Sequence, residues 1–142
     1  GMKVEDWVLT RRLGFGGMAD VWLAHNPNHP DIAQREVAIK IFDKEISNPE
    51  HDDNLRRFDL ESAILKKLQG VDDAFLAVYS TPHFKLDVSG RAPSAHPCIV
   101  MELLKMPSLD EELNRRGALP IDEAVAISLA ICRAMKKAHD LV

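Results

Sequence analysis

Two isolated charges, each inside an apolar pattern, most strongly constrain how this chain folds. Lys40 is the one charged residue in the β-branched run at residues 37–42, which is typical of a strand covered on both faces. Glu61 interrupts the apolar stripe of a helical pattern, which consists of Phe58, Leu65 and Leu68. An unpaired buried charge costs several kcal/mol. The sequence therefore predicts that the strand lysine and the helix glutamate form an ion pair. The alternative is that Glu61 lies at the edge of the stripe and that Lys40 reaches water.

A glycine-rich segment separates two short apolar runs near the start of the chain. Gly14, Gly16 and Gly17 lie between a strand expected at residues 7–13 and another at residues 20–24. Glycines let backbone N–H groups approach phosphate oxygens, because no Cβ stands in the way. The segment therefore indicates a phosphate-binding loop, and an ordinary hairpin turn remains an alternative.

Two other phosphate-binding loops fit this segment less well. A dinucleotide-binding turn follows a buried apolar strand and opens a helix. Here Arg11 and Arg12 stand directly before Leu13, and the residues after the glycines have the pattern of a strand. A Walker loop is excluded because no Gly-Lys-Ser/Thr follows the glycines. A glycine-rich hairpin between two strands is the interpretation that remains.

The rest of the chain predicts three further strands and three helices. Strands are expected at residues 36–42, 76–84 and 98–104, with loops at residues 26–35 and 87–97. A helix-start signal at residues 47–49 and a stop signal at Gly70 bound the first helix. Ser108 and Glu111 form a capping box for a short helix that ends at Gly117. Pro120 opens a last helix that runs toward Ala138.

The composition bounds the class of protein. The chain has 142 residues, 46% of them hydrophobic, and a formal net charge of -4, which suits one domain with its own core. No basic stripe is present, so we expect no nucleic-acid partner. We expect no membrane segment and no signal peptide, because no apolar run approaches the ~20 residues that cross a bilayer. Cys98 and Cys132 are too few for a disulfide framework, which indicates a cytoplasmic protein, and we expect both to be buried.

These motifs, in this order, resemble the protein kinases, and most closely the bacterial eukaryotic-like (Hanks-type) serine/threonine kinases. The matching segments are Gly14 to Ala19, Val37-Ala38-Ile39-Lys40, Arg57-Phe58-x-x-Glu61, Ile99 to Leu104, Ser108 to Leu113 and Leu119 to His139. The resemblance implies an α+β fold. Residues 2–104 would form the kinase N-lobe, a five-stranded antiparallel sheet with one C-helix, the hinge included. Residues 105–142 would form the first two helices of the C-lobe, truncated before the catalytic loop.

The resemblance also implies a function and a set of site residues. The parent protein would transfer the γ-phosphate of ATP to protein Ser/Thr hydroxyls, with Lys40 and Glu61 as catalytic residues. Lys40 would contact the α- and β-phosphates and would be held by Glu61. The implied nucleotide contacts are Leu13, Gly14, Gly16, Gly17, Val21, Ala38, Lys40, the gatekeeper Met101, and the backbone of Glu102 and Leu104.

Several parts of the kinase pattern do not occur in these 142 residues. The chain contains no His-Arg-Asp, Asp-Phe-Gly or Ala-Pro-Glu segment. The metal ligands for Mg²⁺ are therefore expected outside this chain, and none is predicted within it; His25 and His29, in a proline-broken loop, do not suggest a zinc site. We expect the chain alone to bind ATP weakly at most and to transfer no phosphate. The alternative is a non-catalytic, pseudokinase-like module that binds nucleotide or another protein.

The last predicted helix is apolar around almost its whole circumference. Between Ala124 and Met135 only Ser128 and Arg133 interrupt the apolar residues. A helix of this kind expects burial on all sides. The sequence therefore predicts self-association of the chain through residues 120–142.

Overall fold

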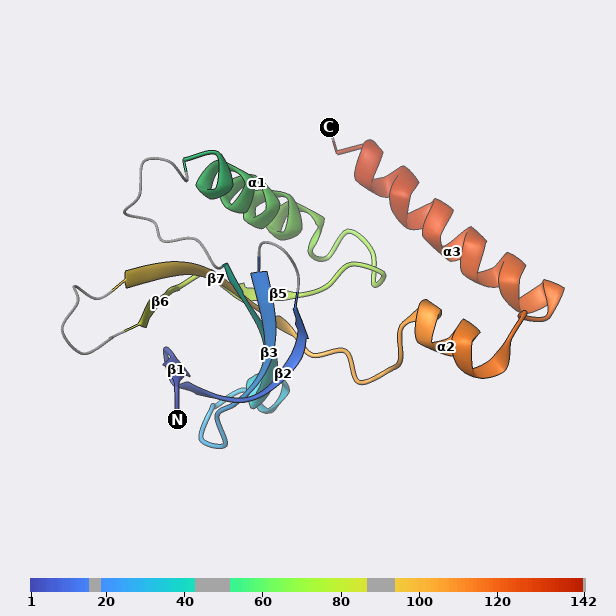
Figure 1. The fold of residues 1–142 in the computed structure, drawn as a ribbon. Helices are drawn as coiled ribbons and strands as arrows, with labels where there is room; N and C mark the ends of the chain where they lie inside the picture. Colours follow the sequence, from blue (N-terminus) through green and yellow to red (C-terminus); the bar gives the residue numbers. More distant parts are fainter. Residues whose placement is uncertain (16–18, 43–51, 87–93, 142) are drawn as a thin grey trace.

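The computed structural model describes residues 1–15, 19–42, 52–86 and 94–141, and it shows a curled antiparallel sheet, one helix lying across the sheet and two helices beside it (Figure 1). The strands are β1 (Lys3–Val4), β2 (Trp7–Phe15), β3 (Ala19–His25), β4 (Glu36–Phe42), β5 (Val78–Ser80), β6 (His83–Leu86) and β7 (Ser94–Glu102). The helices are the 3-10 turn η1 (Ile32–Gln34), α1 (Asp52–Leu68), α2 (Leu109–Arg116) and α3 (Ile121–His139).

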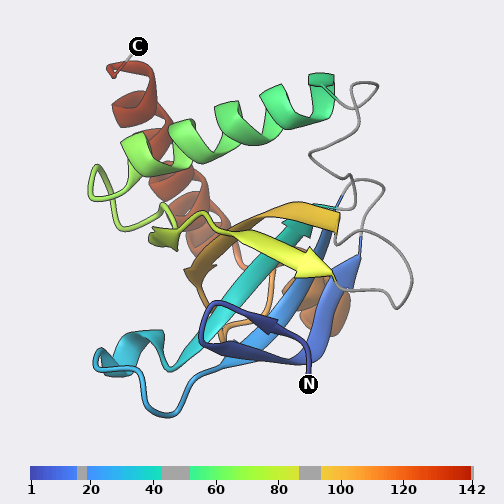
Figure 2. The same cartoon turned by 90° about the vertical axis from the view of Figure 1, so that its left-hand side faces the viewer.

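Sheet order and alternation create two separate apolar cores. The strands follow the order β1-β2-β3-β4-β7-β5, and β6 also pairs with β7. Successive side chains of a strand point to opposite faces. One face packs against α1, which crosses the sheet (Figure 2); its buried residues are Ala19, Phe42, Phe58, Val78 and Ile99. The opposite face is enclosed where the sheet curls and β1 contacts β6; its buried residues include Val4, Val37, Ile39, Cys98 and Val100.

The predicted α+β fold is confirmed, with differences at β1, β5, β6 and β7. The expected strand at 76–84 is two strands, β5 and β6, which flank Thr81 and Pro82. Proline has no N–H to donate to a ladder, and here the Pro82 carbonyl accepts from the N–H of Cys98 instead. Strand β1 was not predicted, because its two residues are too few to show the alternation of a strand. The sheet therefore has seven strands in the described residues, where five were expected.

The predicted loop at 87–97 is wrong in its second half. Residues 94–97 belong to β7 and pair with β6, with Lys85 opposite Ala95 and His83 opposite Pro97. Its first half, residues 87–93, and the helix-start signal at 47–49 lie outside the described residues. The loop at 26–35 contains η1, which the Asp31 side chain caps by accepting a hydrogen bond from the Ala33 N–H.

The two C-terminal helices have the ends that the sequence predicts. Ser108 caps α2 in a capping box with Glu111, and Gly117 ends it at a φ of 79°. Arg116 of α2 binds Glu123 of α3. No helix in the described part of the chain is both long and apolar enough to cross a membrane.

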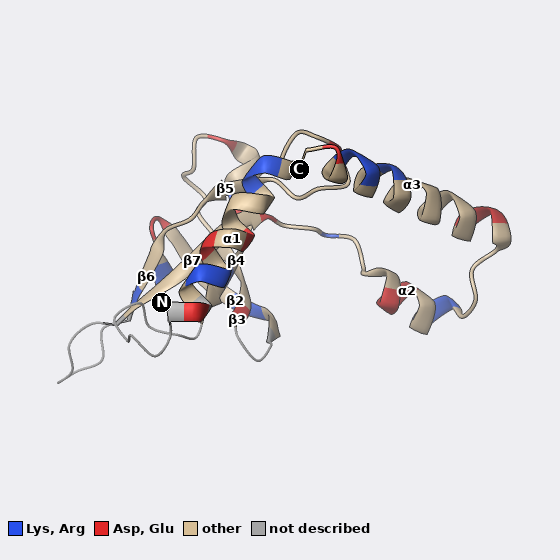
Figure 3. Ribbon diagram, turned by 90° about the horizontal axis from the view of Figure 1, so that it is seen from above, with Lys and Arg blue, Asp and Glu red and all other residues tan. Residues whose placement is uncertain are grey.

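Burial of α3 differs from what its composition predicts. Ala134 is its one buried residue among those described. Cys132 is exposed, so the prediction that both cysteines are buried holds only for Cys98. The reason is that α3 meets the rest of the chain along one side, where Lys137 binds Asp72 at 2.6 Å. Figure 3 shows α2 and α3 extending away from the sheet.

We predict that Ile39→Ala destabilises the fold far more than Ile32→Ala. The Ile39 side chain is fully buried and Ile32 is 74% exposed. Truncation of a buried isoleucine costs about 2–5 kcal/mol, because it removes contacts and leaves a cavity. Truncation of the exposed one costs less than about 0.5 kcal/mol. Denaturant unfolding of both variants measures the difference, and equal losses would contradict the assignment of the core.

Candidate active site

The strand register places the predicted nucleotide contacts on one face of the sheet. Gly14 lies opposite Val21, and Val21 lies opposite Lys40. Ala38 lies opposite Met101 on the next strand. Ala38 and Lys40 are two positions apart on β4 and therefore share a face. This is the face that carries α1, because the next residue on the same side of β4 packs against that helix.

The predicted ion pair between strand and helix is confirmed. Lys40 Nζ lies 2.6 Å from Glu61 Oε1. The two side chains are 27% and 39% exposed, so the pair lies at the edge of the core and opens toward solvent. The burial that the sequence pattern suggests for Glu61 is therefore only partial.

Two aromatic rings support this ion pair and were not predicted as part of the site. The Phe42 ring centroid lies 5.0 Å from Lys40 Nζ, within range of a cation–π interaction. Phe42 in turn meets Phe58 edge to face, with ring centroids 4.9 Å apart. Phe42 follows Lys40 by two positions and Phe58 precedes Glu61 by three. Each ring therefore lies on the same face as the charge that it supports, which is the signal that sequence reasoning could have used.

The β2–β3 hairpin forms the glycine end of the site. Phe15 lies opposite Asp20, and Arg12 forms an ion pair with Asp20 across the two strands. The glycines thus connect antiparallel strands, which confirms a hairpin and is incompatible with a strand-to-helix dinucleotide turn. Gly16 and Gly17 lie outside the described residues. A Cβ added to Gly14 would meet no atom within 4 Å, so the backbone there is open to approach.

Hydrogen bonds and an ion pair to neighbouring segments hold the end of β7 and the residues that follow it. The Glu102 N–H donates to the Ala77 carbonyl at 2.9 Å. Lys105 Nζ lies 2.6 Å from Glu36 Oε2, and this contact lowers the pKa of the Glu36 carboxyl. Leu13 and Leu104 are 39% and 63% exposed, so both predicted contacts remain accessible.

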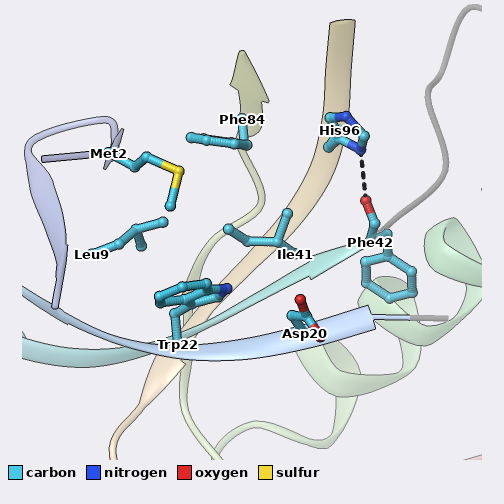
Figure 4. Close-up of a pocket in the computed structure, with 8 residues that line it drawn as sticks. All are labelled: Met2, Leu9, Asp20, Trp22, Ile41, Phe42, Phe84 and His96. Atoms are coloured by element: carbon cyan, nitrogen blue, oxygen red, sulfur yellow. Dashed lines mark hydrogen bonds between the residues drawn. The ribbon is translucent and has the colours of Figure 1, made fainter. Parts of the chain in front are cut away.

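A cavity on the opposite face of the sheet is distinct from this site. It measures about 220 Å³ and is lined by Met2, Leu9, Asp20, Trp22, Ile41, Phe42, Phe84 and His96. Figure 4 shows Met2, Leu9, Trp22, Ile41 and Phe84 gathered on one side of the sheet, with His96 Nδ1 2.9 Å from the Phe42 carbonyl. The Phe42 ring itself packs against Phe58 on the α1 side. Neither Lys40 nor Glu61 lines this cavity, which belongs to the apolar core on the face of the sheet opposite α1.

The comparisons with known proteins show the family. A family model described as protein tyrosine and serine/threonine kinase matches residues 7–140. The chain is 32% identical over 143 residues to the serine/threonine-protein kinase PknA of Corynebacterium glutamicum, covering 94% of this chain and 27% of that protein. It is 30% identical over 133 residues to PksC of Streptomyces coelicolor, covering 91% of this chain and 22% of that protein. The chain therefore belongs to the protein kinase family, and it spans about a quarter of the length of these curated relatives.

A solved structure shows the same fold. The kinase domain of Mycobacterium tuberculosis PknI, in a mutant form, superposes with a TM-score of 0.64 and 24% identity. The match covers 95% of this chain and 49% of that domain. The arrangement of sheet, α1, α2 and α3 is therefore that of part of a kinase domain.

We predict that Ser62→Ala stabilises the fold. The Ser62 side chain on α1 is 7% exposed, and its hydroxyl has no hydrogen-bond partner among the described residues. An unsatisfied buried hydroxyl costs about 1–3 kcal/mol, and alanine also favours the helix. The variant should unfold at a higher denaturant concentration. Exposed Ser128, which donates to the Ala124 carbonyl, is the control at which the same change should give only the smaller gain from helix propensity.

Proposed function

We propose that this chain is the ATP-binding part of a serine/threonine protein kinase, which transfers the γ-phosphate of ATP to protein Ser/Thr hydroxyls. The observation that carries the proposal is the Lys40–Glu61 ion pair on the sheet face shared with Val21, Ala38 and Met101. A cation held at the edge of an apolar surface is suited to a ligand with a flat base and a chain of phosphates.

Each group in the proposed site has one task toward ATP. Lys40 Nζ binds the α- and β-phosphates, and the Glu61 carboxylate holds it in place. The backbone at Gly14, Gly16 and Gly17 covers the phosphates. Leu13, Val21, Ala38 and Met101 form the apolar wall against the base. Because the Glu102 N–H is already bonded to Ala77, this residue offers its carbonyl to the amino group of adenine, and Leu104 offers its N–H.

The residues described are suited to the phosphates and the base of ATP. Room for the ligand exists at Gly14, and the cation for the phosphates is in place at Lys40. In the family the Mg²⁺ ligands belong to the catalytic-loop and Asp-Phe-Gly segments, which do not occur in these 142 residues, so the proposal assigns no Mg²⁺ ligand to them. N-lobe residues 2–104 would grip the nucleotide, and residues 105–142 would begin the C-lobe.

We predict that nucleotide binding by this chain depends on Lys40. The wild-type chain should bind a fluorescent ATP analogue, and Lys40→Met should bind it about tenfold or more weakly, because one charge-assisted contact is worth about 1.5–3 kcal/mol. Glu61→Gln should weaken binding less, since it frees the lysine without removing it. Lys85→Met, on β6, is the control for loss of one positive charge. Equal affinity of the wild type and Lys40→Met would contradict the proposed site.

We predict that the 142-residue chain alone transfers no phosphate. Incubation with radiolabelled ATP and a generic acceptor protein should give no label above that of the Lys40→Met variant. The reason is that phosphoryl transfer needs a positioned base and metal ligands as well as bound phosphates. Transfer that disappears in Lys40→Met would show that the missing groups are dispensable. Nucleotide binding without transfer by any longer form of the protein would favour the pseudokinase-like alternative.

We also propose that the protein works in the cytoplasm, because a kinase needs the ATP that is present there. Self-association through residues 120–142 is also proposed, because exposed apolar side chains recur along α3.

A further inference from the structure

The last residue of β7 pairs in an irregular way with the residue that precedes β5. The Glu102 N–H donates to the Ala77 carbonyl at 2.9 Å, as it would in an antiparallel ladder. In a regular hydrogen-bonded pair the Ala77 N–H would donate in return to the Glu102 backbone carbonyl. Here it donates to the Glu102 carboxylate, with 3.3 Å between the Ala77 nitrogen and Glu102 Oε2. The side chain thus takes the place of its own backbone carbonyl in the ladder.

The alternation along β7 shows that this carbonyl would otherwise belong to the ladder. The Cys98 N–H donates to the Pro82 carbonyl and the Glu102 N–H donates to Ala77, so both residues direct their backbone groups toward the side of β5 and β6. The N–H and C=O of a residue in a regular antiparallel strand face the same neighbour. The Glu102 carbonyl would therefore also face Ala77 if the strand continued, and the carboxylate takes the donor that would hold it there.

Ala77 itself is held in register by the residue that follows it. Val78 lies opposite Met101 in the ladder between β5 and β7. The Val78 N–H donates to Gln69 Oε1 at 3.2 Å, which ties the edge strand β5 to the residue that follows α1. The Ala77 N–H therefore stays beside Glu102, and the Glu102 side chain decides which of the two acceptors of that residue it meets.

We propose that Glu102 is a positioning residue of the adenine site, whose carboxylate takes the Ala77 N–H and so leaves the Glu102 backbone carbonyl for the base. This inference rests on the proposed function, because it concerns the same nucleotide, and it adds a determinant of base specificity. Adenine carries an amino group where guanine carries an oxygen. A carbonyl oxygen that faces this position accepts a hydrogen bond from adenine and repels guanine.

The exchange of acceptors is tested by NMR without nucleotide, through scalar couplings across hydrogen bonds. In the wild-type chain the Ala77 nitrogen should show no coupling to the backbone carbonyl carbon at position 102. In Glu102→Leu this coupling should appear, because the side chain no longer offers an acceptor. Glu102→Gln is the matched control, since it also lacks the charge but keeps an oxygen acceptor, and it should behave as the wild type does. The coupling in the wild type, or its absence in Glu102→Leu, would overturn the proposal.

The consequence for the base is tested by competition of ATP and GTP with a fluorescent ATP analogue. The wild-type chain should prefer ATP to GTP, and Glu102→Leu should lose about three- to tenfold of this preference, which is the share of one hydrogen bond. Glu102→Gln should keep most of the preference. Inorganic tripolyphosphate, which has no base, should bind to the two variants with affinities within about twofold of each other. Equal preference for ATP in Glu102→Leu and Glu102→Gln would overturn the proposal.

The same measurements separate this inference from the proposed function. If the wild type binds neither ATP nor tripolyphosphate, the nucleotide site is wrong, and the role of Glu102 in base specificity falls with it. If the wild type and both variants bind ATP with one preference over GTP, the site stands and this inference alone is wrong. Disruption of the fold by Glu102→Leu would lower the affinities for ATP and tripolyphosphate together. Glu102→Ala removes the acceptor without adding bulk, and it should lose the preference for ATP as Glu102→Leu does.

Discussion

The Lys40–Glu61 ion pair is the interaction on which the candidate site depends, and apolar packing holds it in place. Both side chains are partly exposed, and ion pairs of this kind contribute about 0–1 kcal/mol. Burial of Phe58, which is 4% exposed, contributes about 1.5–3 kcal/mol. The contact between Phe58 and Phe42 therefore sets the rotation of α1, and the position of Glu61 follows from it. The charge pair adds direction to an arrangement that the aromatic rings already fix.

The sheet can serve as a platform because it is packed on both faces. Ile39 and Val37 point into the core on the face opposite α1, while their neighbours Ala38 and Lys40 point toward α1. Ile39 and Val37 are both fully buried. A strand fixed in this way presents its alternate residues rigidly, which a ligand site requires. Arg12 and Asp20 extend the same principle to the hairpin, where an ion pair joins the two strands that carry the glycines.

The sequence predicts the parts of the fold that arise from local patterns, and fails where long-range pairing decides. The helix ends at Gly70 and Gly117 and the Lys40–Glu61 pair were predictable, because a turn residue or an isolated charge has few solutions. Residues 94–97 read as a loop because of their composition, but they become a strand when β6 pairs with them. Cys132 was expected to be buried because free cysteines usually are, but burial depends on what lies beside the helix. The contacts proposed for Gly16 and Gly17 stay predictions.

The two parts of the chain are held by different forces. The sheet and α1 share apolar cores, whereas α2 and α3 connect to them through the Lys105–Glu36 and Lys137–Asp72 ion pairs, apart from the chain itself and the buried Ala134. The lysine partners lower the pKa of both carboxyls, so these contacts persist at neutral pH and are lost as the pH falls through the lowered values. Exposed pairs of this kind are weak and are screened by salt. The position of α3 relative to the sheet is therefore less firmly fixed than that of α1, which packs against the sheet through the buried Phe58.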